Sequence, residues 1–195
     1  DEDIIHNMGR VDPIADAEVI MTELILADVE SATGQIQKNE KKARGQDKDA
    51  AANVALLERL IPELNEGKPA NLLDLDEEEK LRLKSFCLLS SKPMLYACNL
   101  KEEEIIDPSA NEKFVAFEQW ANQQQDATCC AISAKMEEEL SELEEAEAQE
   151  YLESMGVSDS GVTSLIKACY DLLGLASYLT AGEKEARAWT FTKGM

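Results

Sequence analysis

The chain has 195 residues, of which 44% are apolar and 30% are charged, so it can bury the core of one sizeable domain or two small ones. Aromatic residues make up only 5%, which favours helix-rich packing over an all-β sandwich. The formal charge of -21 excludes a protein that holds DNA or RNA through its overall field. No apolar run approaches the roughly 20 residues of a membrane span, and the five cysteines contain no CxxC pair, which argues against a disulfide framework or a zinc ribbon.

A helical pattern begins at Asp12-Pro13, where Pro13 suits a first helical turn and Asp12 can cap it. The pattern fades at Gly34 into a polar stretch over residues 35–49. Apolar or small residues recur at spacings of 4, 3 and 4, which predicts that they form the buried face of this helix: Ile20, Leu24, Ala27 and Ser31.

A second helical run follows, with Val54, Leu57, Ile61 and Leu64 at spacings of 3, 4 and 3. Two such helices joined by a polar turn predict an αα-hairpin, a two-stranded antiparallel coiled coil. Residues 65–69 form a break, and a short helix over about 77–85 comes next.

Residues 93–98 are the most strand-like segment, and a second apolar run follows at 127–132 after a helix over about 112–125. Strand, helix and strand at this spacing predict a βαβ unit with parallel strands. Two strands do not make a stable parallel sheet by themselves. We therefore expect further strands from elsewhere, and the start at Asp1 without Met is typical of a piece of a longer protein.

The last third of the chain is predicted to be helical and then extended. Residues 137–153 contain nine Glu and no Lys or Arg, which indicates a solvated acidic helix. An amphipathic helix follows over about 162–173, and the loose alternation of residues 178–191 predicts a strand pair.

Two short motifs follow the two parallel strands. Asn99-Leu100-Lys101-Glu102 comes after the first strand, and Ser133-Ala134-Lys135 comes after the second. Ligands of open α/β sheets bind at the carboxyl ends of the strands. In P-loop GTPases these two places read the purine base, usually as Asn-Lys-x-Asp and Ser-Ala-Lys. The sequence therefore predicts a base site made by Asn99, Leu100, Glu102, Ser133 and Ala134.

The departures from the usual motif point towards adenine. Leu100 stands where the motif has Lys and can still cover a base face with apolar surface. Glu102 stands where the motif has Asp, and its extra methylene carries the carboxylate past the guanine edge. Adenine offers an acceptor at N1 and a donor at N6, so it is not penalised by that displacement. We expect a relaxed preference for guanine or a preference for ATP.

One local stretch reverses the sign of the chain's charge. Residues 34–48, at the predicted hairpin tip, hold five basic and two acidic residues, a net charge of +3. The basic ones are predicted to contact RNA phosphates, against the alternative of an ordinary solvated tip: Lys38, Lys41, Lys42, Arg44 and Lys48.

Together these motifs resemble the YchF family of Obg-related, ribosome-associated P-loop ATPases. The resemblance covers essentially the whole chain. It is carried by Asp12-Pro13 with Glu23-Leu24, by the run 92–96 leading into Asn99-x-x-Glu102, and most specifically by residues 181–190, which read Ala-Gly-x-x-Glu-x-Arg-Ala-Trp-Thr.

The resemblance implies an α/β fold with a large helical content: the C-terminal half of a P-loop G domain with a parallel sheet, an inserted coiled-coil hairpin and the start of a TGS domain. It places G-domain segments at 1–30 and 68–177, the hairpin at 31–67 and the TGS start at 178–195. It also implies a cytoplasmic protein that binds the large ribosomal subunit and its RNA, and neither a membrane nor a specific DNA sequence.

The family's NxxE motif maps onto Asn99 and Glu102, so the resemblance implies ATP as the nucleotide, with GTP as the alternative. The chain contains no Gly-x-x-x-x-Gly-Lys-Ser/Thr. The phosphate-binding loop, the Mg²⁺ ligands and the switch motif are expected upstream of Asp1. We therefore expect no catalytic residue and no metal ligand within this chain, and no ATP hydrolysis by it alone. The alternatives are a GTPase of the same class and a non-enzymatic helical interaction module.

Overall fold

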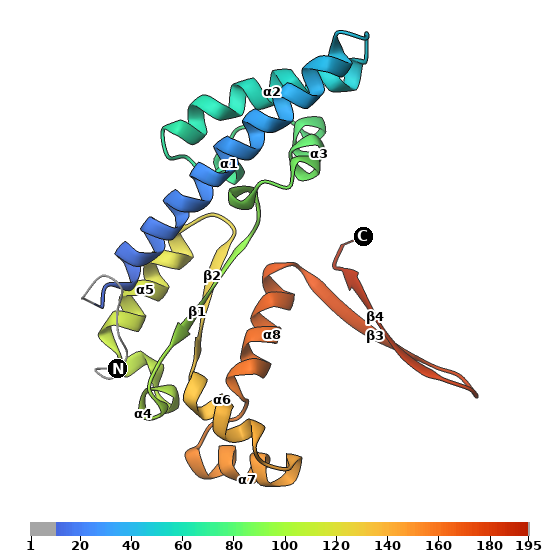
Figure 1. Cartoon of the computed structure of the whole chain (residues 1–195). Coiled ribbons are helices and arrows are strands. Elements are labelled where there is room, and N and C mark those ends of the chain that lie inside the picture. Colours follow the sequence, from blue (N-terminus) through green and yellow to red (C-terminus); the bar gives the residue numbers. More distant parts are fainter. Residues whose placement is uncertain (1–10, 195) are drawn as a thin grey trace. The chain divides into compact units, whose positions relative to one another are not determined.

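The computed structural model describes residues 11–194, which divide into a unit of residues 12–92 and a unit that begins at Pro93. Helices predominate, and one pair of parallel strands and one pair of antiparallel strands accompany them (Figure 1). This composition confirms the predicted α/β class with a large helical content.

The first unit is built on two helices, α1 (Pro13–Ala43) and α2 (Lys48–Asn65), which pack along each other and are joined by a short turn (Figure 1). The chain then passes through the 3-10 turn η1 (Ala70–Leu72), the helix α3 (Glu77–Phe86) and the 3-10 turn η2 (Leu89–Ser91). The helical pair and the helix over about 77–85 agree with the sequence-based expectation.

Helix α1 is longer than its sequence pattern predicts. Its start agrees, because Asp12 accepts a hydrogen bond from the Ala15 amide and Pro13 occupies the first turn. The expected fading at Gly34 is wrong: the helix continues to Ala43, although a glycine costs about 1 kcal/mol relative to alanine inside a helix. Good helix formers follow Gly34, and Ile36 packs against the buried cluster, which offsets that cost.

The predicted buried face of α1 is displaced by one residue. Ile20 is 59% exposed, whereas the buried positions include Ile25, Asp28 and Ala32. These three residues also follow helical spacing. Because the middle one is an aspartate, the sequence pattern alone does not identify them as a buried face. In α2 the prediction holds better, since Leu57 and Leu64 are fully buried.

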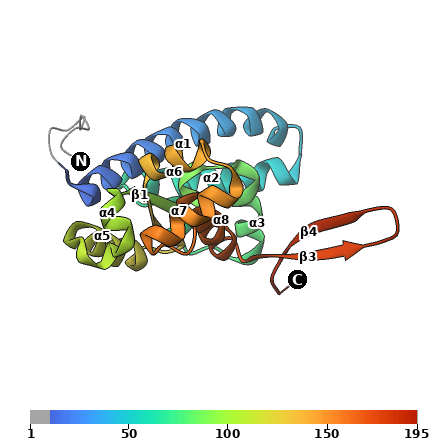
Figure 2. The same cartoon turned by 90° about the horizontal axis from the view of Figure 1, so that it is seen from below.

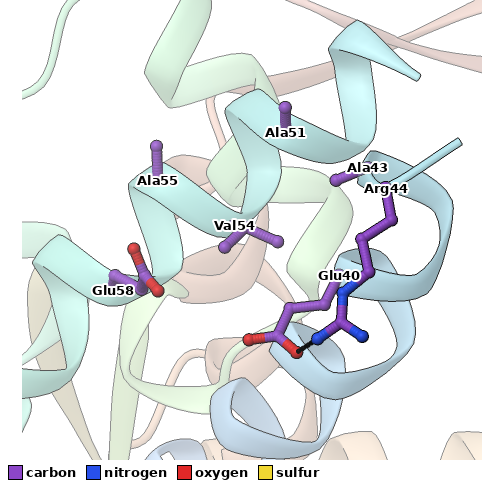
Figure 3. A pocket seen from close by; sticks show the side chains of 7 residues that line it. All are labelled: Glu40, Ala43, Arg44, Ala51, Val54, Ala55 and Glu58. Carbon is purple, nitrogen blue, oxygen red and sulfur yellow. Dashed lines mark ion pairs between the residues drawn. The ribbon is translucent and has the colours of Figure 1, made fainter. Parts of the chain in front are cut away.

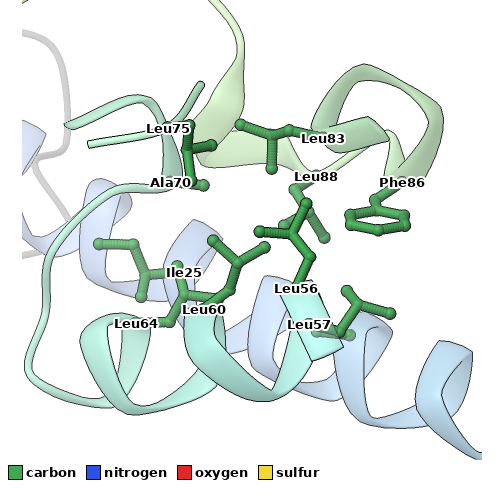
Figure 4. Close-up of a cluster of buried hydrophobic side chains, with 11 residues drawn as sticks. Ile25, Leu56, Leu57, Leu60, Leu64, Ala70, Leu75, Leu83, Phe86 and Leu88 are labelled. Carbon is green, nitrogen blue, oxygen red and sulfur yellow. The ribbon is translucent and has the colours of Figure 1, made fainter. Parts of the chain in front are cut away.

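The core of this unit lies between the two helices and the segment that follows them (Figure 4). Leucines of α2 face Ile25 of α1 on one side and the chain from Ala70 to Leu88 on the other. Burying one leucine side chain contributes about 1.5–3 kcal/mol, so this cluster is the main stabilising term of the unit. Its members are Ile25, Ala32, Leu56, Leu57, Leu60, Leu64, Ala70, Leu75, Leu83, Phe86 and Leu88.

Asp28 is a buried carboxylate, 1% exposed, that joins α1 to η2. One oxygen accepts from the Leu89 amide at 2.6 Å, and the other accepts from the Ser90 amide at 2.7 Å and from the Ser90 hydroxyl at 2.6 Å. The Ser90 hydroxyl oxygen in turn accepts from the Ala70 amide at 3.0 Å. The carboxylate therefore satisfies the backbone donors at the start of η2, and so its burial stabilises the unit.

The second unit opens with the predicted βαβ arrangement. Strand β1 (Met94–Asn99) leads through the short helix α4 (Glu102–Ile106) and the 3-10 turn η3 (Pro108–Ala110) to α5 (Glu112–Gln123) and β2 (Ala127–Ile132). The two strands are parallel, which confirms the prediction. Their register pairs the first residues of both strands and the last residues of both strands, so the strands end side by side.

Three helices and a hairpin complete this unit (Figure 2). The acidic stretch forms two helices, α6 (Ala134–Ser141) and α7 (Glu145–Met155), and the amphipathic helix is α8 (Gly161–Leu172). Strands β3 (Leu175–Ala181) and β4 (Ala186–Thr192) form the predicted strand pair, and the two strands are antiparallel. Within residues 11–194, no helix is long and apolar enough to cross a membrane.

The β1–β2 pair has different neighbours on its two faces. Tyr96 meets the rings of Phe117 and Trp120 of α5 at centroid distances of 5.3 and 5.7 Å. The opposite face is covered by α8 (Figure 1). No residue of α8 is fully buried, and Val162 and Ile166 remain half exposed, so the part of the chain described here leaves the apolar side of α8 incompletely covered.

Replacing Asp28 tests its role in the first unit. Asp28→Asn keeps the size of the side chain, but it removes the charge and turns an NH₂ group towards backbone donors. We expect the free energy of unfolding to fall by about 2–4 kcal/mol in a urea titration. The exposed Glu30→Gln on the same helix serves as the control, with a change within about 0.5 kcal/mol. An Asp28→Asn protein as stable as the control would contradict this account.

The cysteines of the β1–β2 pair give a second prediction. Burial, with the nearby Cys129 thiol adding to it, raises the pKa of Cys98 to about 12, whereas Cys87 lies exposed after α3. Near pH 8 only about one Cys98 thiol in ten thousand is then ionised. Alkylation followed by mass spectrometry should modify Cys87 first, with the Cys98 rate still rising above pH 10. Equal rates for the two thiols would contradict the assignment.

Candidate nucleotide-base site

The candidate site lies where β1 and β2 end together. Asn99 is the last residue of β1 and lies opposite Ile132, the last residue of β2. The Leu100 amide continues the ladder by donating to the Ile132 carbonyl at 2.8 Å. Ser133 follows β2 and is buried, and its hydroxyl caps α6 by accepting from the Met136 amide at 3.4 Å. Both predicted motifs therefore lie at one edge of the strand pair.

A direct hydrogen bond joins the two motifs. The Asn99 side-chain oxygen accepts from the Ala134 amide at 2.9 Å, across 35 residues of sequence. This bond fixes the amide group of Asn99, so its NH₂ group points away from the Ala134 amide. Asn99 and Ala134 are both exposed, which leaves this group accessible to a ligand.

Glu102 begins α4, whose start is held by Glu104. One carboxylate oxygen of Glu104 accepts from the Lys101 amide at 3.0 Å, and the other accepts from the Asn111 side chain at 2.8 Å. These two bonds attach the first turn of α4 to the start of α5. Leu100, immediately before this turn, is partly buried.

The carboxylate of Glu102 is paired with Lys135, the residue after Ala134. The Lys135 ammonium lies 3.2 Å from one oxygen, Oε1, and donates a hydrogen bond to the other, Oε2, at 3.3 Å. Glu102 is 23% exposed, and its Oε1 is buried without a hydrogen bond from any of residues 11–194. The hydrogen bond and negative charge of Glu102, together with the charge of Glu139, raise the pKa of Lys135.

The helix that carries Ala134 and Lys135 is attached to α8. Glu137 accepts a hydrogen bond from the Gly161 amide at 2.5 Å, at the start of α8. A Cβ at Gly161 would lie 3.2 Å from the Ile132 Cβ, so a glycine permits this close approach of α8 to the end of β2. Among the described residues, no three His, Cys, Asp or Glu side chains are grouped as metal ligands.

The structure brings together Asn99, Glu102, Ser133 and Ala134, with Leu100 between the first two. The two motifs do not predict the ion pair between Lys135 and Glu102, because the two residues come from different helices. The only local signal at Lys135 points to another partner: Lys135 and Glu139 have the i, i+4 spacing of a helical ion pair, and their charged groups lie 3.8 Å apart.

The predicted basic residues lie together at the end of the α1–α2 pair. Lys38, Lys41 and Lys42 belong to the last turns of α1, Arg44 lies in the turn and Lys48 begins α2, and all five are exposed. Arg44 is paired with Glu40 at 3.6 Å. Residues of α1, α2 and the turn between them line an open depression of about 430 Å³. Figure 3 shows their side chains: Glu40, Ala43, Arg44, Ala51, Val54, Ala55 and Glu58.

Comparison with known proteins shows similarity along the whole chain. It is 45% identical over 195 residues to the ribosome-binding ATPase YchF of Bacillus subtilis and 36% identical over 193 residues to that of Escherichia coli O157:H7. These matches cover 100% and 99% of the chain, but the chain spans only 53% and 52% of those proteins.

The structure of the Schizosaccharomyces pombe YchF GTPase matches the fold with a TM-score of 0.76 at 30% identity. That match covers 100% of this chain and 53% of the other. No family model matches the chain. The resemblance to the YchF family, predicted from the two motifs and from residues 181–190, is thus confirmed by similarity that runs along the whole chain and covers about half the length of these proteins.

Proposed function

We propose that this chain supplies purine-base recognition to a ribosome-associated, nucleotide-binding ATPase. The observation that carries the proposal is the meeting of Asn99, Ala134 and the Glu102 carboxylate at one edge of the β1–β2 pair. That edge offers an amide donor for the purine N7, an acceptor for an exocyclic amine and an apolar residue, Leu100, to cover the base. A GTPase of the same class is the alternative, and the names of the relatives include both activities.

The hydrogen bond between Asn99 and Ala134 favours adenine. In the usual base-reading arrangement, a backbone amide near this alanine meets the guanine carbonyl. Here the Ala134 amide already donates a hydrogen bond to the Asn99 side chain. A guanine carbonyl could accept from this amide only by displacing that hydrogen bond. Adenine carries an amine instead of a carbonyl at that position and needs no such donor. A polar group that is left without a hydrogen-bond partner on binding costs about 1–3 kcal/mol, which is enough to produce a preference for ATP over GTP.

Hydrolysis is proposed for a longer protein rather than for this chain. The chain spans about half the length of its curated relatives, and a two-stranded parallel pair with a partly uncovered α8 fits one part of a larger sheet. In such a protein Mg²⁺ and the phosphates would be held by residues outside residues 1–195. The residues of this chain would select and orient the base, in a cytoplasmic protein.

Binding of fluorescent ATP and GTP to a protein of the relatives' full length tests the proposal. We expect tighter binding of ATP. Asn99→Ala should weaken it about tenfold, because it loses both the N7 contact and the link to Ala134. Glu102→Asp should shift the ratio of affinities towards GTP by about threefold to tenfold, because the shorter side chain places the carboxylate at the guanine edge.

Glu103→Asp is the matched control, because Glu103 is the exposed neighbour of Glu102 in the same turn and should leave the ratio unchanged. Tighter binding of GTP by the unmodified protein would favour the GTPase alternative. If neither Asn99→Ala nor Glu102→Asp changes the binding of ATP or GTP, the result would favour the non-enzymatic interaction module.

We further propose that the basic tip contacts ribosomal RNA of the large subunit. Five exposed basic side chains gather around one turn, in a chain whose net charge is -21. Lys41 and Lys42 also lie at the carboxyl end of α1, where the helix dipole stabilises their positive charge. Since the rest of the chain repels phosphate, the tip would also orient the protein as it approaches RNA.

Reversing the charge of Lys41, Lys42 and Arg44 to Glu should weaken co-sedimentation with ribosomes and flatten its dependence on salt concentration. Each lost phosphate contact should lower the slope of log K against log salt by about 0.7–0.9. Lys113, Lys184 and Lys193, three exposed lysines of the other unit, give a control with the same change of net charge when they are reversed together. Identical salt series for the two triple variants would show that the tip does not contact the RNA.

A further inference from the structure

We infer that Lys135 is a positioning residue that holds the Glu102 carboxylate for adenine recognition. This inference rests on the base-recognition function proposed above and adds a residue to it. Lys135 comes from α6 and Glu102 from α4, and their side chains meet across 33 residues of sequence. The pair therefore links the two motifs a second time, beside the bond between Asn99 and Ala134.

A glutamate at this position needs such support. Its side chain has three rotatable bonds, and it stands on a helix of five residues at the edge of the unit. Without a partner, the carboxylate would sample solvent and would present no fixed acceptor to a base. The Lys135 ammonium, 3.2 Å and 3.3 Å from the two oxygens, confines the carboxylate to one place.

Contacts with α6 and α7 hold Lys135 in place. Its ammonium lies 3.8 Å from Glu139, and the other oxygen of Glu139 accepts from the Tyr151 hydroxyl of α7 at 2.9 Å. The backbone of α6 is fixed by the cap at Ser133 and by the bond from Gly161 to Glu137. Lys135 is thus attached to an anchored helix and reaches over to a glutamate on a short one.

The carboxylate also keeps acceptor capacity for the ligand. Oε1 is buried and lies 3.2 Å from the Lys135 ammonium, and Oε2 accepts the hydrogen bond from Lys135. Because a carboxylate oxygen has more than one lone pair, Oε2 can also accept from an exocyclic amine such as that of adenine. When Lys135 is absent the carboxylate moves freely, both purines bind through the remaining contacts, and discrimination between them falls.

The test is a double-mutant cycle on the ratio of ATP to GTP affinity, in a protein of the relatives' full length. Lys135→Met keeps the length of the side chain and removes its charge. We expect the ratio of ATP to GTP affinity to fall about threefold to fivefold, which corresponds to the free energy that a partly exposed ion pair contributes. Lys135→Arg should restore it, because a guanidinium can also reach both oxygens. In a Glu102→Ala background, Lys135→Met should change nothing further.

Lys113→Met, an exposed lysine on α5, controls for the loss of one charge in the same unit. If Glu102→Ala lowers the ratio but Lys135→Met does not, the positioning role is wrong and base recognition by Glu102 stands. If Glu102→Ala leaves the ratio unchanged, base recognition by Glu102 and the role of Lys135 are both wrong. A Lys135→Met effect that persists in the Glu102→Ala background would show that Lys135 acts by another route.

Discussion

The in-register pairing of two parallel strands is the constraint on which the candidate site depends. Because β1 and β2 end opposite each other, Asn99 and Ser133 leave the sheet side by side. A shift of one residue would turn one of these side chains to the other face, since strand side chains alternate. The register is supported from both faces, by the aromatic packing of Tyr96 against α5 and by α8, which starts beside the end of β2 at Gly161.

The site is then tightened by polar contacts between the two motifs. Asn99 to Ala134 and Glu102 to Lys135 are both long-range pairs between residues that no local pattern connects. Each involves exposed groups and contributes little to stability alone. Their effect is geometric, because together they fix an amide donor and a carboxylate acceptor relative to one another before any ligand arrives.

Elements with strong local signals could be predicted from the sequence, and those that depend on tertiary contacts could not. The second strand was predicted at residues 127–132 and is found there, because a short apolar run between polar residues has few alternatives. The end of α1 was predicted nine residues early at Gly34, because the packing of Ile36 that sustains the helix is not a local property. Its buried face was misassigned because a buried aspartate looks like solvent-facing surface until its donors at residues 89 and 90 are known.

The same limit applies to the site. Asn99, Glu102, Ser133 and Ala134 could be located because their motifs follow predicted strands and the rule for open sheets puts ligands there. Lys135 could not be assigned a role, since its partner comes from a different helix and the distance between them is a product of the fold.

The uninterrupted length of α1 has a mechanical consequence. Its 31 residues span about 46 Å at the rise of an α-helix, from the cap at Asp12 to the basic tip. A helix of this kind, packed along a second one, behaves as a stiff rod. A force applied at the tip therefore tilts the whole helix about its Asp12 end, because the helix does not bend between the two ends. Gly34 is the only glycine in α1, and the helix passes through it without interruption.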